Sequence, residues 1–231
     1  MLKEVSSIVR TESLTRIYRV GAREVRALQG VSLEIGQGKF VALRGRSGSG
    51  KTTFLNCIAG LDQPTSGHVW LLGEDVTRMP ERKRVRLRRQ RIGFVFQSFA
   101  LLPTYSAHEN VDLMLRLAVA KRRDRSKRVR EVLGLVGLQR WADHRPFELS
   151  GGQQQRLAIA RALSTRPALI LADEPTGELD SATGQQILEL FQRVVEHEGT
   201  SVLMATHDLT VDLYADQVVH LEDGCVVQPE K

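Results

Sequence analysis

The chain has 231 residues, enough for one domain with a full hydrophobic core or for two lobes, and a net charge of +6. Although 42% of the residues are hydrophobic, no segment approaches the ~18 consecutive apolar residues of a membrane span. Residues 1–20 also lack a signal-peptide pattern, so we expect a soluble cytoplasmic chain with no direct membrane insertion. Cys57 and Cys225 fit that compartment, and each is predicted to be a packing residue without a disulfide.

The positive charge is concentrated in two basic runs. Residues 82–91 and residues 121–130 each hold seven Lys or Arg in ten positions, enough to attract nucleic acid, anionic lipid or an acidic partner. The simpler interpretation is that each run forms the solvated face of a helix.

The first 40 residues and the region around Trp70 are typical of short antiparallel strands. Residues 31–35 alternate apolar and polar side chains, and residues 68–76 place a Gly-Glu-Asp turn after an apolar run. Between these two regions, the apolar residues 40–43 predict a buried strand.

A Gly-rich segment, GRSGSGKTT, follows that strand and precedes a helix predicted over residues 51–59. The pattern Gly-x-x-x-x-Gly-Lys-Thr is typical of a phosphate-binding P-loop, whose backbone N–H groups surround phosphate oxygens. In such a loop the lysine reaches the terminal phosphates and the threonine hydroxyl binds magnesium. The residues expected to contact the phosphates are Gly45, Arg46, Ser47, Gly48, Ser49, Gly50, Lys51, Thr52 and Thr53.

The middle of the chain predicts helices without strands. Ser106 and Glu109 form a capping box, and four apolar residues between 129 and 136 share one helix face. A further helix opens on Ser150 and two glycines in the segment LSGGQQQRLAIARAL, residues 149–163. Because helix N-termini bind anions, this is a second candidate phosphate site. One chain therefore carries two such sites, whereas one nucleotide needs only one.

Two later apolar runs, residues 168–172 and 201–206, are typical of parallel strands buried on both faces, and a helix ended by Gly199 lies between them. Ligands of parallel sheets bind beyond the carboxyl ends of the strands. Asp173 and Glu174 follow the first run, where they are expected to hold magnesium and to polarise the attacking water. A solvated helix cap is the structural alternative for this pair. His207 follows the second run, where a histidine merely satisfied by a backbone partner is an equal alternative.

Together these motifs resemble the ABC ATPase family over essentially the whole chain. They occur in family order as Gly45–Thr53, Gln97, Leu149–Gln153, Asp173, Glu174, Asp180 and His207. The resemblance implies an α/β fold with a P-loop NTPase (RecA-like) core, an N-terminal antiparallel β subdomain and an inserted α-helical subdomain. Residues 1–97 and 163–231 would form the core with the β subdomain, and residues 98–162 the helical subdomain.

The resemblance also implies a head-to-tail homodimer that hydrolyses ATP with Mg²⁺. The signature motif of one copy closes over ATP held by the P-loop of the other, and the ATPase drives a separate integral-membrane permease from the inner face of the membrane. The catalytic residues that it implies are Glu174, His207, Lys51 and Gln97, with Thr52, Gln97 and Asp173 at the metal. It further implies ATP contacts from Tyr18, which stacks on adenine, from Ser150, Gly151, Gly152 and Gln153, and from Asp180 in the loop between the two sites.

Finer detail is similar to the subfamily of lipoprotein-release, macrolide-export, peptide-antibiotic-resistance and cell-division ATPases. The similarity is carried by FVFQSFALLPTYSAHENV at residues 94–111 and by LADEPTGELDSATG at residues 171–184. One departure is Glu178, where the subfamily usually has Asn, since a carboxylate adds negative charge near the dimer interface.

The loop after Gln97 is unusually apolar, with Phe99, Leu101, Leu102 and Tyr105. Because loops normally face water, we expect a groove for a short helix of the membrane subunit. The alternative is that these side chains pack beneath the helical lobe.

The sequence also bears on two other functions. The basic runs suggest a nucleic-acid-associated ABC ATPase of the repair or translation type, but the chain lacks heptads, Cys clusters and a second cassette, so no nucleic acid is expected. A non-hydrolysing regulatory dimer is disfavoured because Lys51, Asp173, Glu174 and His207 are all present.

Overall fold

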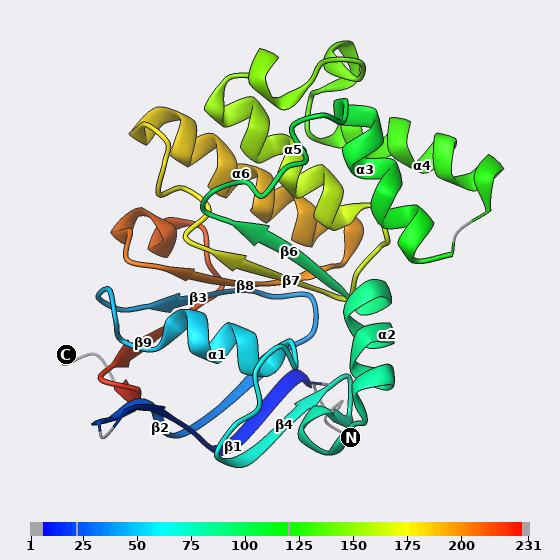
Figure 1. Cartoon of the computed structure of the whole chain (residues 1–231). Coiled ribbons are helices and arrows are strands. Elements are labelled where there is room, and N and C mark those ends of the chain that lie inside the picture. The colour runs from blue at the N-terminus through cyan, green and yellow to red at the C-terminus, as the bar shows by residue number, and fades with distance from the viewer. Residues whose placement is uncertain (1–6, 22, 120, 228–231) are drawn as a thin grey trace, which may run out of the picture.

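Two sheets and the helices around them form the layers of the fold (Figure 1). The computed structural model describes residues 7–21, 23–119 and 121–227. Helix α1 (Lys51–Ile58) lies between the two sheets, and the other face of the larger sheet is covered by helices that include α5 (Gly151–Leu163) and α6 (Ser181–Glu198). This arrangement fits the predicted P-loop NTPase class, with its separate antiparallel sheet.

The smaller sheet is antiparallel, with the order β2-β1-β4-β5. The prediction of short strands was wrong for β1 and β2, which are 14 residues each but contain several register shifts. Such bulges interrupt the alternation of apolar and polar residues, so one long strand looks like several short ones. The strands are β1 (Ser7–Val20), β2 (Arg23–Gly36), β4 (Ser66–Leu71) and β5 (Glu74–Asp75).

The predicted Gly-Glu-Asp turn was misplaced. The turn between β4 and β5 is formed by Leu72 and Gly73, both with positive φ, while Glu74 and Asp75 pair with β4. Two residues of positive φ make the tight hairpin whose twist matches the strands. Leu72 gives no turn signal in the sequence, yet its side chain packs against the core, which holds it in this conformation.

The larger sheet has the order β10-β9-β3-β8-β7-β6, and all of its strands except β10 are parallel. The apolar runs predicted at 40–43, 168–172 and 201–206 are β3, β7 and β8, shifted by at most one residue at either end. Since parallel strands end at the same edge, the segments after β3, β6, β7 and β8 meet there. The strands are β3 (Phe40–Arg44), β6 (Ile92–Phe96), β7 (Leu169–Asp173), β8 (Ser201–Thr206), β9 (Gln217–Glu222) and β10 (Cys225–Val227).

The predicted helix ends are confirmed. Gly199, with φ 65°, ends α6, and Ser106 forms a capping box with Glu109 at the start of the helix 107–117. The remaining α-helices are α2 (Glu81–Arg91), α3 (Ala107–Leu117) and α4 (Arg122–Leu135), and the short 3₁₀ helices are η1 (Val76–Arg78), η2 (Gln139–Trp141), η3 (Pro146–Glu148) and η4 (Leu209–Leu213).

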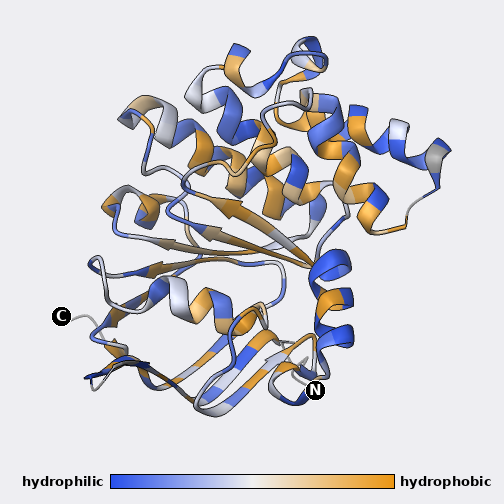
Figure 2. Cartoon of the chain, in the orientation of Figure 1, coloured by the Kyte–Doolittle hydropathy of each residue, from blue (hydrophilic) through white to orange (hydrophobic). Residues whose placement is uncertain are grey.

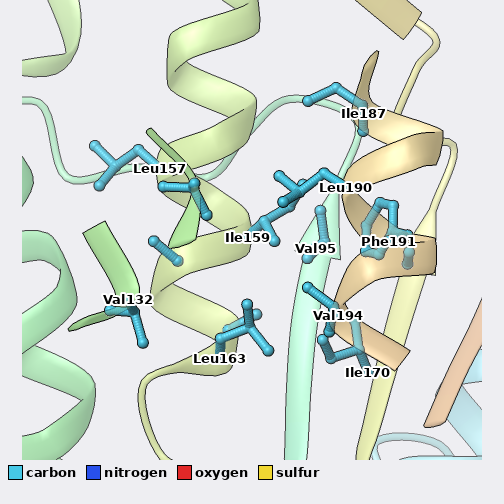
Figure 3. Packing of buried hydrophobic residues seen from close by; sticks show 14 of the residues in the cluster. Val95, Val132, Leu157, Ile159, Leu163, Ile170, Ile187, Leu190, Phe191 and Val194 are labelled. Atoms are coloured by element: carbon cyan, nitrogen blue, oxygen red, sulfur yellow. The ribbon is translucent and has the colours of Figure 1, made fainter. Parts of the chain in front are cut away.

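The hydrophobic residues form two cores, one on each face of the larger sheet (Figure 2). In the core above the sheet, Val95 of β6 and Ile170 of β7 pack against α5 and α6, and Val132 of α4 joins them (Figure 3). The four apolar residues predicted to share one face of this helical region are all buried: Val129, Val132, Leu133 and Val136. The helical region therefore shares one continuous core with the sheet.

The basic runs form α2 and α4, but they are not wholly solvated faces. Arg84 and Arg128 are buried, contrary to the simple interpretation. The guanidinium of Arg128 donates to the Leu163 carbonyl at 2.9 Å and to the Ser164 carbonyl at 3.2 Å, and it pairs with Glu198 at 2.9 Å. Arg128 therefore caps the end of α5 and joins it to α6.

The two cysteines are both free thiols, as predicted, but only Cys57 is buried. Cys225 is exposed, so its predicted packing role was wrong. It lies in the short strand β10 at the edge of the sheet, where both Cys225 and Val226 are exposed.

The buried position of Arg128 predicts a specific loss of stability. Arg128→Ala leaves two carbonyls and Glu198 without their donor, so the free energy of unfolding in urea should fall by about 3 kcal/mol. Arg130→Ala on the same helix is the control, because an exposed arginine should change stability by less than ~0.5 kcal/mol. Equal effects of the two substitutions would contradict the anchoring role.

Candidate functional site

A cavity of about 660 Å³ opens at the carboxyl edge of the larger sheet. Its volume is typical of a site for a small ligand. It collects nine of the residues singled out from the sequence: Ser47, Gly48, Gly50, Lys51, Thr52, Thr53, Gln97, Asp173 and Glu174. Residues from three distant parts of the chain therefore meet at one place.

Two glycines of the loop between β3 and α1 are required by close contacts. A Cβ on Gly45 would lie 2.2 Å from the Leu221 carbonyl oxygen, and a Cβ on Gly50 would lie 2.3 Å from that of Ala27. Gly50 also has φ 104° and caps α1 without a side-chain hydrogen bond. The first N–H groups of α1 therefore remain available to an anion.

Lys51 is held inside this loop, and its side chain is only 6% exposed. Its Nζ donates to the carbonyl of Gly45 at 2.7 Å and to that of Arg46 at 3.1 Å. The Glu174 carboxylate lies 3.4 Å from the same nitrogen. These contacts direct the ammonium group toward the cavity that the P-loop borders.

Asp173 ends β7 beside Thr52, and its Oδ1 is buried without a hydrogen-bond partner among the described residues. Burial raises the pKa of Asp173, and the charge of Glu174 raises it further, while a hydrogen bond with Thr52 lowers it. A carboxylate and a hydroxyl supply the oxygen ligands that Mg²⁺ prefers, with substrate phosphates completing its shell. The donor set therefore fits magnesium.

Glu174 links Lys51 to His207. One carboxylate oxygen faces Lys51, and the other lies 3.0 Å from Nδ1 of His207 and 3.3 Å from its backbone nitrogen. The backbone of Glu174 has φ 46°, a conformation that residues with a Cβ rarely adopt. Such conformations persist where neighbours hold them, often at functional sites. Among the residues that the structure describes, the imidazole of His207 thus has a carboxylate as its hydrogen-bonding partner.

Gln97 follows β6 directly and lines the same cavity. A Cβ on Gly177 would lie 3.1 Å from the Gln97 amide nitrogen, closer than most real contacts. Glycine at position 177 therefore leaves room for this amide between β6 and the loop after Glu174.

A second cavity of about 370 Å³ lies at the N-terminus of α5. Ser150 and Gln153 form a capping box there, with distances of 3.3 Å from the Gln153 nitrogen to the Ser150 hydroxyl and 2.9 Å from the Ser150 nitrogen to the Gln153 side chain. Gly151, Gly152 and Asp180 line the same cavity. The predicted residues around Ser150 therefore also lie together, but in a separate cavity.

Asp180 has a local role that the sequence analysis missed. Its carboxylate accepts hydrogen bonds from the backbone nitrogen of Thr183 at 2.9 Å and from its hydroxyl at 2.6 Å, which caps α6. These bonds to Thr183 lower the pKa of Asp180. The signal was present, because Asp three residues before Thr at a helix start is typical of an N-cap.

Five predicted site residues line neither cavity: Tyr18, Gly45, Arg46, Ser49 and His207. Of these, Tyr18 lies apart from the P-loop and is bound by other residues. Its hydroxyl donates to Asp62 at 2.5 Å, and the guanidinium of Arg16 lies 4.4 Å from the ring centre. The cavity instead includes Val25, Arg26 and Ala27 of β2, for which no motif gave a signal. Glu178 lines both cavities, so the two lie side by side.

The Gly-rich loop follows β3 and precedes a helix at the carboxyl edge of the parallel strands. Strand β7, which is separated from β3 by β8, carries the two carboxylates at its end. This combination defines a P-loop nucleoside triphosphatase. Residues 28–177, more than half of the chain, match the ABC transporter family. The chain belongs to that family and carries its ATP-binding ATPase domain. Among the residues that the structure describes, every helix is too short or too polar to span a bilayer.

Two proteins with similar sequences are both described as ATP-binding. The chain is 47% identical over 225 residues to the macrolide export ATP-binding/permease protein MacB of Syntrophobacter fumaroxidans, covering 96% of this chain but 31% of that protein. It is 46% identical over 221 residues to the lipoprotein-releasing system ATP-binding protein LolD of a Ruegeria species, covering 95% and 97% of the two chains.

Solved structures support the same assignment. The ATP-binding cassette MJ0796 of Methanocaldococcus jannaschii, in a dimeric post-hydrolysis state bound to ADP and Pi, matches with a TM-score of 0.87 and 42% identity. The match covers 96% of this chain and 98% of that one. The family and the fold are therefore shown by sequence and by structure.

The contacts of Glu174 predict the effect of removing its charge. Glu174→Gln should retain ATP binding but lose roughly 10²- to 10⁴-fold in turnover, because an amide cannot accept a proton from the attacking water. Phosphate release and filter binding of labelled ATP measure the two quantities. Glu189→Gln, at an exposed position of α6, is the control and should keep normal turnover. Normal turnover in Glu174→Gln would remove Glu174 from the reaction.

Proposed function

We propose that the chain is the ATP-hydrolysing subunit of a membrane export, lipoprotein-release or force-transmitting system, and that it works as a head-to-tail dimer around two ATP molecules. The observation that carries this proposal is the pair of separate cavities, one at the P-loop and one at Ser150, that share Glu178. A second copy related by a two-fold axis near Glu178 would place each P-loop opposite a Ser150 cavity. Each ATP would then contact both chains.

Two parts of the chain have different roles in the proposed dimer. We propose that residues 98–162 form a helical subdomain that presents Ser150, and that residues 1–97 and 163–231 form the core that holds the nucleotide. Tyr18 would stack on adenine with the ring face that Arg16 leaves uncovered. Asp180 would lie where the two nucleotide sites communicate.

The chemistry rests on the contacts of Lys51, Glu174 and His207. When bound, magnesium would neutralise phosphate charge, with Thr52, Asp173 and Gln97 as the side chains nearest to it. Lys51 would direct its ammonium group to the terminal phosphate, and the N–H groups of the P-loop would bind the phosphate oxygens. Glu174 would orient the attacking water and accept its proton, while His207 would contact the terminal phosphate.

Glu178 distinguishes this chain within the proposed subfamily. It lies beside both cavities, so in the proposed dimer its carboxylate would lie close to the two-fold axis and to the bound phosphates. Like charges at short range oppose closure of the dimer. The exposed Arg46 at the P-loop supplies a positive charge that could offset this effect in the second copy.

The loop after Gln97 supports docking to a membrane subunit at two positions. Asn110 is fully buried and bonds to the backbone of Leu102 at 2.9 and 3.2 Å and to the Tyr105 carbonyl at 3.0 Å. Asn110 thus binds the backbone of the loop at both residues, while Leu102 and Tyr105 are 37% and 40% exposed. Leu101, in contrast, packs against the core. We propose that Leu102 and Tyr105 contact the permease, which holds the chain at the inner face of the membrane.

A mixing experiment tests whether the Ser150 cavity acts on the nucleotide of a second copy. Ser150→Arg and Lys51→Ala should each abolish turnover when the variant is assayed alone. Mixed dimers should regain some activity, because one composite site then carries both defects and the other carries neither. Mixtures of two batches of Lys51→Ala are the control. No recovery at any ratio, although mixed dimers form, would contradict the arrangement in trans.

Leu102→Asp tests the docking surface. Because Leu102 is partly exposed and its backbone is held by Asn110, the melting temperature and ATP binding should stay nearly unchanged, while co-purification with an integral membrane protein should be lost. Leu61→Asp, at a more exposed leucine away from this loop, should keep the partner. A strongly lowered melting temperature in Leu102→Asp would show that Leu102 belongs to the core.

The nucleic-acid alternative has its own test. The exposed arginines of α2 could bind phosphates, so their charge reversal is compared with Leu102→Asp. Loss of a salt-sensitive binding of DNA or RNA, with membrane association intact, would favour that alternative.

A further inference from the structure

Helix α5 and the loop after Gln97 are joined by one arginine, Arg161. Its guanidinium donates to the carbonyl of Ala100 and, at 3.1 Å, to that of Phe99. No carboxylate among the described residues pairs with it, and burial lowers the pKa of Arg161. A partly desolvated charge that is paired only with backbone carbonyls of another segment needs an explanation.

The two residues that Arg161 holds have an unusual backbone. Phe99 has φ 57° and Ala100 has φ 49°, so two consecutive residues with a Cβ adopt the left-handed conformation. Single residues of this kind are uncommon, and a pair is held only where the surroundings determine it. The Arg161 guanidinium binds both carbonyls of this pair, so it is positioned to hold the conformation.

This loop connects both cavities. Gln97, two residues before Phe99, lines the nucleotide cavity. A Cβ on Gly151 would lie 3.9 Å from the ring of Phe99 and 3.6 Å from Leu179, so both side chains lie beside the first residue of α5. The Phe99 ring therefore lies beside the end of α5 that borders the Ser150 cavity, while its carbonyl is bound by Arg161 near the other end.

We infer that Arg161 is a positioning residue that holds the Phe99–Ala100 loop in its left-handed conformation and thereby places the Gln97 amide at the nucleotide cavity. The inference rests on the proposed function, in which Gln97 contacts the bound nucleotide and its metal. In the proposed dimer, the Ser150 end of α5 faces one ATP and Gln97 faces the other. Arg161 thus links the two nucleotide sites through a single rigid helix.

A purely structural role is the alternative, because a basic residue in the last turn of a helix also stabilises that helix. The two roles differ in what they change. A helix-stabilising residue affects the melting temperature, whereas a positioning residue affects kcat after the protein has folded. They also differ in what restores the activity, since only a positioning role is relieved by a glycine in the loop.

The test uses the full chain and the steady-state hydrolysis of ATP with Mg²⁺. Arg161→Met keeps the length of the side chain but removes its donors, so kcat should fall about tenfold or more while KM changes less than about threefold. Adding Ala100→Gly should restore part of kcat, because glycine adopts the left-handed conformation without a Cβ clash. Arg161→Lys keeps one donor and the charge, and it should give an intermediate kcat even if Arg161→Met folds poorly.

Three results would overturn the inference. One is normal kcat in both Arg161→Met and Arg161→Lys. Another is a fall in kcat that follows the melting temperature and is not relieved by Ala100→Gly. The last is additivity with Gln97→Ala, because a residue that acts through Gln97 should cause little further loss once that amide is removed.

Gln97→Ala also separates this inference from the proposed function. If Gln97→Ala lowers kcat and Arg161→Met adds its full effect on top, the role of Gln97 stands and that of Arg161 fails. If Gln97→Ala leaves kcat unchanged, the proposed role of Gln97 fails, and the inference about Arg161 fails with it.

Discussion

The shared direction of β3, β6, β7 and β8 is the constraint on which the rest of the molecule depends. Parallel strands end at one edge, so the segments that follow them are brought together although they are far apart in the sequence. The P-loop, Gln97, the Asp173–Glu174 pair and His207 each follow one of these strands. The contacts of Glu174 with Lys51 and His207 depend on this common edge.

Helix α5 is the second element around which the site is organised. It shares the core above the sheet with α6 and β6, and Arg128 binds the carbonyls at its end. Gln155 is fully buried, and its side-chain nitrogen donates at 2.6 Å to the carbonyl of Pro175, directly after Glu174. With Arg161 bound to the loop after Gln97, α5 is fixed to two of the segments that border the nucleotide cavity. A movement of the Ser150 end of α5 would therefore displace both the loop after Gln97 and the segment after Glu174.

Local patterns in the sequence predicted what depends on local forces. The apolar runs of the larger sheet, the Gly-rich loop, the capping box at Ser106 and the start of a helix at Ser150 are all of this kind. Contacts between distant segments gave no such signal. Tyr18 is bound by Asp62, Arg128 is buried against α5, and Phe99 is left-handed without being a glycine. Each of these depends on a partner that only the folded chain supplies.

In the proposed dimer, two copies of the chain enclose two ATP molecules. Native mass spectrometry of the wild-type chain, trapped with Mg²⁺, ADP and vanadate, tests it most directly. We expect one species at twice the 25.9 kDa of the chain plus two trapped nucleotides. A single chain that holds one trapped nucleotide, with no dimer at any concentration of chain, would contradict it.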